Sequence, residues 1–135
     1  MPPGGHVEPD EDPLQAVLRE IREETGIAAA IIATRSEFTF SEPSSLPPPY
    51  TILIEDIPAG EREPAHQHID LIYFCHPVPD DAPNPVADPT LRWVDEDELR
   101  SGLPLEVVSC GVSAAIPEDV GELALIAIKS SRHAL

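Results

Sequence analysis

Basic residues are scarce in this chain. Its 135 residues include 8 Lys and Arg against 25 Asp and Glu, which gives a formal net charge of −17 at pH 7. Nucleic-acid polymers and anionic membranes both require a basic surface on the protein that binds them. We therefore expect neither a nucleic-acid polymer nor a membrane as a partner.

Cysteines and long apolar runs are also lacking. Cys75 and Cys110 are the only cysteines, which is too few for a disulfide framework or a zinc pattern. The first residues do not form the basic and apolar segments of a signal peptide, and no apolar run is long enough to span a bilayer. These absences predict a protein of the reducing cytoplasm.

Aromatic residues make up only 4% of the chain, so we expect an aliphatic core. The length is that of one domain, and we expect residues 1–135 to form it. The 17 prolines gather in connecting segments, which favours extended loops between the elements.

A helix is predicted between Asp12 and Gly26. Asp12 is a suitable N-cap, Pro13 suits the first helical position, Gln15 can complete a capping box, and Gly26 is a suitable C-terminal stop. One buried face follows the spacing of an amphipathic helix and comprises Leu14, Val17, Leu18 and Ile21.

Three glutamates stand in the last turns of this helix. Glu20, Glu23 and Glu24 repel one another by roughly 0.2–0.5 kcal/mol per pair, and the helix dipole disfavours negative charge there. Glu20 and Glu24 lie on the flank of the apolar stripe, with Glu23 farther round on the same side. The pattern indicates a site for a divalent cation; the alternative is a solvated helix face.

Residues 5–27 resemble the signature of the Nudix (MutT-like) hydrolase family, G-x5-E-x7-R-E-U-x-E-E-x-G-U, where U is a bulky aliphatic residue. We call this segment the box. The later segments HQHIDLIYF and RWVDEDEL are also similar to Nudix sequences. The specified positions of the signature are filled by Gly5, Glu11, Arg19, Glu20, Ile21, Glu23, Glu24, Gly26 and Ile27.

The resemblance implies an enzyme that hydrolyses the diphosphate linkage of a nucleoside diphosphate joined to another group X. Its partner would be a small nucleotide-like molecule, and its cofactor Mg²⁺ or Mn²⁺. Both are hard cations that prefer carboxylate oxygens. Together with the order of the elements, the resemblance implies an α/β fold, an α/β/α sandwich around a mixed sheet.

The family pattern also implies roles for single residues. Glu20, Glu23 and Glu24 would bind the metal together with the backbone carbonyl of Gly5, and Glu23 could also act on the attacking water.

Three further positions of the box would support these acids. Arg19 would orient a glutamate, with Glu11 as its partner, and Gly26 would end the helix. A purely structural Arg19–Glu11 ion pair remains an open alternative.

Only residues 1–4 precede the box, where the family normally has several strands. We expect a domain that lacks the usual N-terminal strands, unless the start was assigned too late. A partner chain could replace them, which makes a homodimer an open alternative. Two other functions stay open: a Nudix-like binding or regulatory module without turnover, and an acidic scaffold without metal.

The other elements are predicted from alternation, turn residues and caps. We expect strands within residues 28–40 and at 50–57, 66–76 and 91–94. We expect helices at 95–100, where Asp95 and Glu98 form a capping box, at 105–116 and at 118–129.

His66, His68 and Asp70 alternate along one face of the third expected strand. They could form a wall of the substrate site or a second metal site for zinc or manganese. The alternative is a solvent-facing or hydrogen-bonded side, with the opposite face packed inward through Ile69, Leu71, Tyr73 and Cys75.

Three further side chains have expected roles. Asp88 stands in a loop that could supply an extra acid to the site. Trp93 is interpreted as a packing anchor, and Cys75 as strand packing rather than a nucleophile.

Overall fold

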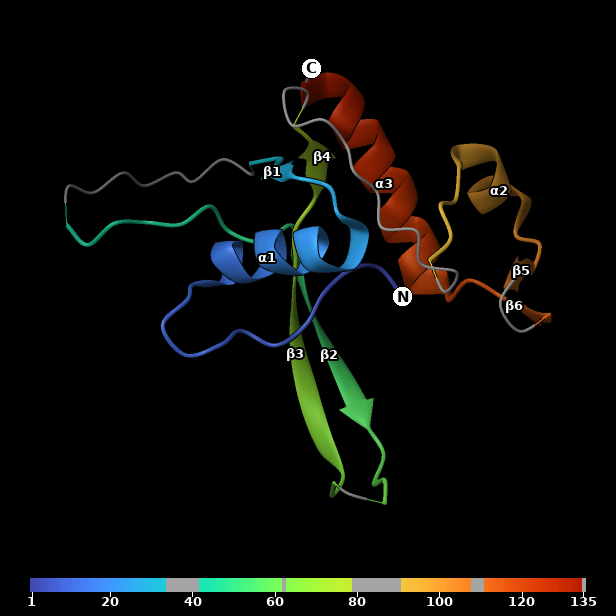
Figure 1. The fold of residues 1–135 in the computed structure, drawn as a ribbon, viewed down its shortest axis with the longest axis horizontal. Helices are drawn as coiled ribbons and strands as arrows, with labels where there is room; N and C mark the ends of the chain where they lie inside the picture. Colours follow the sequence, from blue (N-terminus) through green and yellow to red (C-terminus); the bar gives the residue numbers. More distant parts are fainter. Residues whose placement is uncertain (34–41, 62, 79–90, 108–110, 135) are drawn as a thin grey trace.

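The computed structural model describes residues 1–33, 42–61, 63–78, 91–107 and 111–134. Short strands alternate with three helices along this part of the chain (Figure 1). In chain order the elements are α1 (Pro13–Thr25), β1 (Ala29–Ile31), β2 (Thr51–Ile57), β3 (His66–Ile72), β4 (Cys75–Pro77), α2 (Glu96–Ser101), β5 (Leu105–Val107), β6 (Val112–Ala114) and α3 (Glu118–Ala134).

This mixture of helices and strands confirms the expected α/β class. Across the described ranges the strands form three antiparallel ladders, β1–β4, β2–β3 and β5–β6, where we expected one mixed sheet. The first two ladders meet at the short break between β3 and β4. There Ile72 O accepts from Tyr50 N at 2.7 Å, and Phe74 O accepts from Ile32 N at 2.7 Å.

Helix α1 begins and ends where its local sequence predicts. The Asp12 carboxylate accepts from Leu14 N at 2.8 Å and from Gln15 N at 3.0 Å, and Gln15 Oε1 accepts from Asp12 N at 2.9 Å. This is a complete capping box, with Pro13 in the first turn. Gly26 has φ 72°, a left-handed conformation that costs glycine little, and its N–H donates to Arg22 O at 2.9 Å.

The other element predictions divide into correct and incorrect ones. The helix capped by Asp95, the C-terminal helix and the strand at 50–57 are confirmed. The strand expected at 91–94 is wrong, because these residues have no regular structure. The helix expected at 105–116 is also wrong: it is the β5–β6 ladder. Gly111, at φ 63°, lies between these strands, and glycine is a poor residue for a helix interior.

The ladder β2–β3 extends away from the helices as a long hairpin (Figure 1). Of the residues expected to pack inward, Leu71, Tyr73 and Cys75 are half-buried, but Ile69 is not. Ile54 and Ile69 are each 69% exposed, so the interpretation that Ile69 packs inward is wrong. The half-buried face carries His66 and His68, because the N-terminal segment lies against it.

Few described side chains are fully buried. Ala16 and Phe74 are buried, and the Phe74 ring stacks on Tyr50 with the ring centroids 4.2 Å apart. Trp93 is exposed, so its interpretation as a packing anchor is wrong. None of the described helices has the length and apolar content needed to cross a membrane.

Because Phe74 is one of the few buried large side chains, we predict that Phe74→Ala lowers the free energy of unfolding by about 3 kcal/mol. The exposed Ile54→Ala is the matched control and should change it by less than about 0.5 kcal/mol. Urea unfolding of the three proteins measures both values. Equal effects of the two substitutions would contradict a core centred on Phe74.

Candidate functional site

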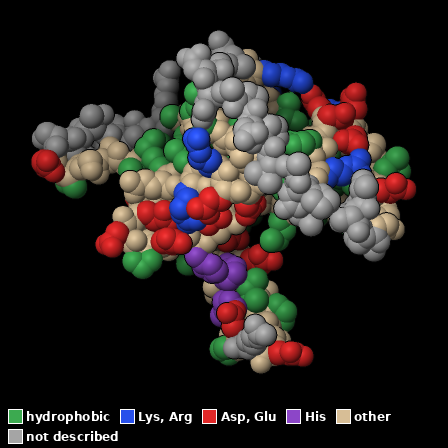
Figure 2. Space-filling view, in the orientation of Figure 1, with side chains coloured by type: hydrophobic (Ala, Val, Ile, Leu, Met, Phe, Trp, Pro, Cys, Tyr) green, Lys and Arg blue, Asp and Glu red, His purple; other side chains and the backbone are tan. Residues whose placement is uncertain are grey.

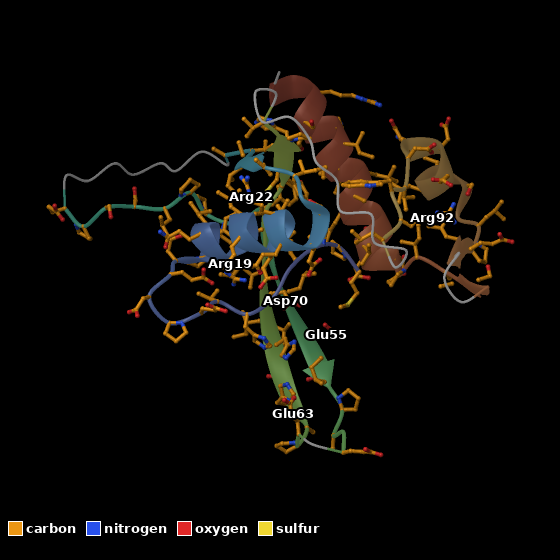
Figure 3. All side chains as sticks on the ribbon, in the orientation of Figure 1. Arg19, Arg22, Glu55, Glu63, Asp70 and Arg92 are labelled. Carbon is orange, nitrogen blue, oxygen red and sulfur yellow. The ribbon has the colours of Figure 1, made fainter. Side chains whose placement is uncertain are left out.

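The guanidinium of Arg19, on α1, contacts several acids of the box (Figure 3). Nε and Nη2 donate to the two oxygens of Glu11 at 3.2 and 2.8 Å. Nη1 donates to Glu20 at 2.8 Å and to Glu23 at 3.2 Å, and Nη2 also donates to His6 O at 3.3 Å. These contacts use all five N–H groups of the guanidinium as donors.

The acids around Arg19 differ in exposure. The side chains of Glu11 and Glu20 are 15% and 16% exposed, whereas that of Glu23 is 61% exposed. Hydrogen bonds from Arg19, followed by the backbone N–H of Glu8, hold the pKa of Glu11 below its ordinary value. Hydrogen bonds to Glu11 and then to Glu20 raise the pKa of Arg19 above its ordinary value. Glu11 and Glu20 are fixed, and Glu23 faces solvent.

The backbone of Gly5 lies directly against the Glu20 carboxylate. A Cβ atom at Gly5 would overlap this group, since the carboxyl carbon Cδ would lie 2.6 Å away. A Cβ at the neighbouring Gly4 would meet nothing within 4 Å. A side chain at position 5 would therefore force the Glu20 carboxylate to shift, so the glycine allows an expected metal-binding acid to lie against the backbone of residue 5.

Histidines of the hairpin lie beside the box. His66 Nε2 and His68 Nε2 are 3.1 Å apart, and the His68 ring meets that of His6 edge-on at 5.6 Å. Figure 2 shows histidine side chains next to acidic and basic ones on this face. Asp70 follows on the same half-buried face of β3. His6 was missed by the sequence reasoning, although its place after Gly5 could have suggested it.

Comparison with known proteins decides the family. The family model of the NUDIX domain matches residues 2–109, which include the box, the hairpin and α2. The chain belongs to the Nudix family. Membership supports, in general terms, hydrolysis of substrates in which a nucleoside diphosphate is joined to another group. A search of the curated proteins gives no match.

Not every expected site residue of this Nudix domain joins the Arg19 set. Glu24 is exposed on α1 and lies outside that set of hydrogen bonds. Asp88 falls outside the described residues. Within the described ranges, no three or more His, Cys, Asp or Glu side chains are already arranged around one ion position. Arg19 instead forms ion pairs with Glu11, Glu20 and Glu23.

The donor chemistry of the Nudix box nevertheless fits a hard divalent cation. Carboxylate oxygens and the Gly5 carbonyl are the ligands that Mg²⁺ and Mn²⁺ prefer. The Gly5 backbone, which would supply the carbonyl, lies against the Glu20 carboxylate. Cys75, the cysteine within the described ranges, is a poor nucleophile, because burial raises its pKa to about 11.

The Arg19–Glu11 ion pair predicts that the Nudix domain loses folding stability in acid. The folded-state pKa of Glu11 lies below the ordinary 4.5, so its stabilising contribution is complete above about pH 4.5 and is lost as the pH falls through the lowered pKa. We predict that the melting temperature of Arg19→Gln falls less steeply than that of the wild type in this acidic window. Thermal unfolding with a chelator present measures both.

Glu11→Gln is the control for this measurement. It should show the same reduced slope, and the double variant should add nothing further in that window. Identical slopes for the wild type and Arg19→Gln would assign the acid sensitivity to other carboxylates.

Proposed function

We propose that the protein is a Mg²⁺- or Mn²⁺-dependent hydrolase that cleaves the diphosphate linkage of a nucleoside diphosphate joined to another group X. One observation carries this proposal: acids of the Nudix box meet at Arg19, on a capped helix, with the Gly5 backbone against Glu20. Family membership supports the reaction class.

Glu20, Glu23, Glu24 and the Gly5 carbonyl would hold the metal. A divalent cation bound there offsets the charge on phosphate oxygens and lowers the pKa of a bound water. The net charge of −17 supports the need for a metal ion. An acidic protein repels a phosphate substrate unless cations reverse the local field.

The side chains of the box have separate tasks in this proposal. Glu11 fixes the Arg19 guanidinium through two hydrogen bonds, and Arg19 positions Glu20. Glu23 is the exposed acid of the set, with one contact to Arg19, and would take a proton from the attacking water at its carboxylate.

The hairpin face is the proposed wall of the substrate site. His66, His68 and Asp70 are half-buried on β3, and His68 contacts His6 of the box.

A Nudix-like binding or regulatory module without turnover is the second candidate. The observation that favours it is that Arg19 already forms ion pairs with Glu20 and Glu23, while the described residues hold no preformed group of three metal ligands. A module of this kind would bind nucleotide without cleaving it.

Activity assays separate the two candidates. We predict that the protein releases nucleotide or phosphate from at least one member of a panel of nucleoside diphosphate derivatives, with Mg²⁺ or Mn²⁺ present. Glu23→Gln should lower kcat by about 10²–10⁴, as expected for loss of a general base. Glu118→Gln, an exposed acid at the start of α3, is the control and should leave kcat unchanged. Absence of turnover across the panel would support the binding module.

The contact between Gly5 and Glu20 allows a test of metal binding that needs no substrate. We predict that Gly5→Ala weakens Mn²⁺ binding at least tenfold, because the added Cβ would displace the Glu20 carboxylate. Gly4→Ala adds the same atom into open space and should bind Mn²⁺ like the wild type. Electron paramagnetic resonance of free Mn²⁺ measures both affinities. Equal affinity in the two variants would remove Gly5 and Glu20 from the metal site.

A further inference from the structure

Two imidazoles of the hairpin lie at chelating distance from each other. His66 and His68 are separated by one residue of β3, so their side chains project from the same face. Their Nε2 atoms are 3.1 Å apart, and the rings are tilted by 54°. In a tetrahedral zinc site, Zn–N bonds of about 2.0–2.1 Å place neighbouring nitrogens about 3.3 Å apart. The observed separation therefore matches that of two zinc ligands.

The contacts of His66 fix its tautomer. Its Nδ1 atom lies 2.9 Å from Pro64 O, and a carbonyl oxygen can only accept a hydrogen bond. Nδ1 therefore carries the proton of the neutral ring, and the free electron pair lies on Nε2, which faces His68. Metal-binding histidines typically have one ring N–H held by a carbonyl while the other nitrogen binds the ion.

A carboxylate stands next to this pair. Glu63 Oε2 is 3.9 Å from His66 Nε2, and the Glu63 side chain is 74% exposed. Figure 3 shows Glu63 near the turn that joins β2 and β3. The described residues hold no group of three ligands already arranged around one ion position, so Glu63 would have to turn toward the two imidazoles to act as the third ligand.

We propose that His66, His68 and Glu63 form a second metal site, which binds one transition-metal cation of the zinc class. A water molecule would fill the fourth position. Imidazole nitrogen suits Zn²⁺, whereas Mg²⁺ prefers oxygen ligands, so the hairpin site and the Nudix box select different ions. The site lies next to the box, because His68 contacts His6. It does not depend on the proposed hydrolase activity.

Competition with a chromogenic zinc chelator tests this site in the full chain, with Mg²⁺ in excess and no substrate. We expect one Zn²⁺ per chain, with affinity reduced at least tenfold in His66→Gln and in His68→Gln, and less strongly in Glu63→Gln. His76→Gln is the matched control, since His76 is another strand histidine whose Nδ1 faces a carbonyl, 3.0 Å away at Pro77. It should bind Zn²⁺ like the wild type.

Wild-type affinity in His66→Gln or His68→Gln would overturn the site. Loss of Zn²⁺ in Glu20→Gln instead would place the ion in the box and would also overturn it. Nitrogen NMR of the wild-type histidines gives a test that needs no substitution. The Nε2 signals of His66 and His68 should shift with Zn²⁺ while those of His76 do not, and unchanged signals at saturating Zn²⁺ would overturn the proposal.

Discussion

The Arg19 guanidinium is the interaction on which the described site depends. Glu20 and Glu23 would repel each other at the negative end of the α1 dipole, and this cation lies against both of them. Glu11 holds the same cation with two hydrogen bonds. Arg19 therefore orders three acids at once, and a metal ion would have to share or replace its contacts with Glu20 and Glu23.

The same side chain joins α1 to the N-terminal segment. Arg19 donates to His6 O, Gly5 lies against Glu20, and the His6 ring meets His68 of the hairpin. A continuous set of contacts thus runs from the helix through residues 5 and 6 to β3. In this arrangement the polar face of the hairpin becomes its covered face, and isoleucines are left on the open one.

Much of the local structure could be predicted from the sequence. The capping box of Asp12 and Gln15, the stop at Gly26 and the cap at Asp95 all depend on residues within a few positions of one another. Errors arose where the pattern was ambiguous. Residues 105–116 are apolar enough for either a helix or strands, and within this range Leu105–Val107 and Val112–Ala114 pair as the β5–β6 ladder. The exposure of Trp93 depends on distant packing that no local pattern encodes.

The same distinction between local sequence and tertiary packing applies to the candidate site. The sequence by itself determined the box, its acids and the family, because the motif has a fixed spacing along one helix and its flanking turns. Only the tertiary structure decided that one arginine collects Glu11, Glu20 and Glu23, that Gly5 abuts Glu20, and that two histidines face each other beside His6. These contacts join residues up to some sixty positions apart, and their geometry follows from how the helix, loop and hairpin pack.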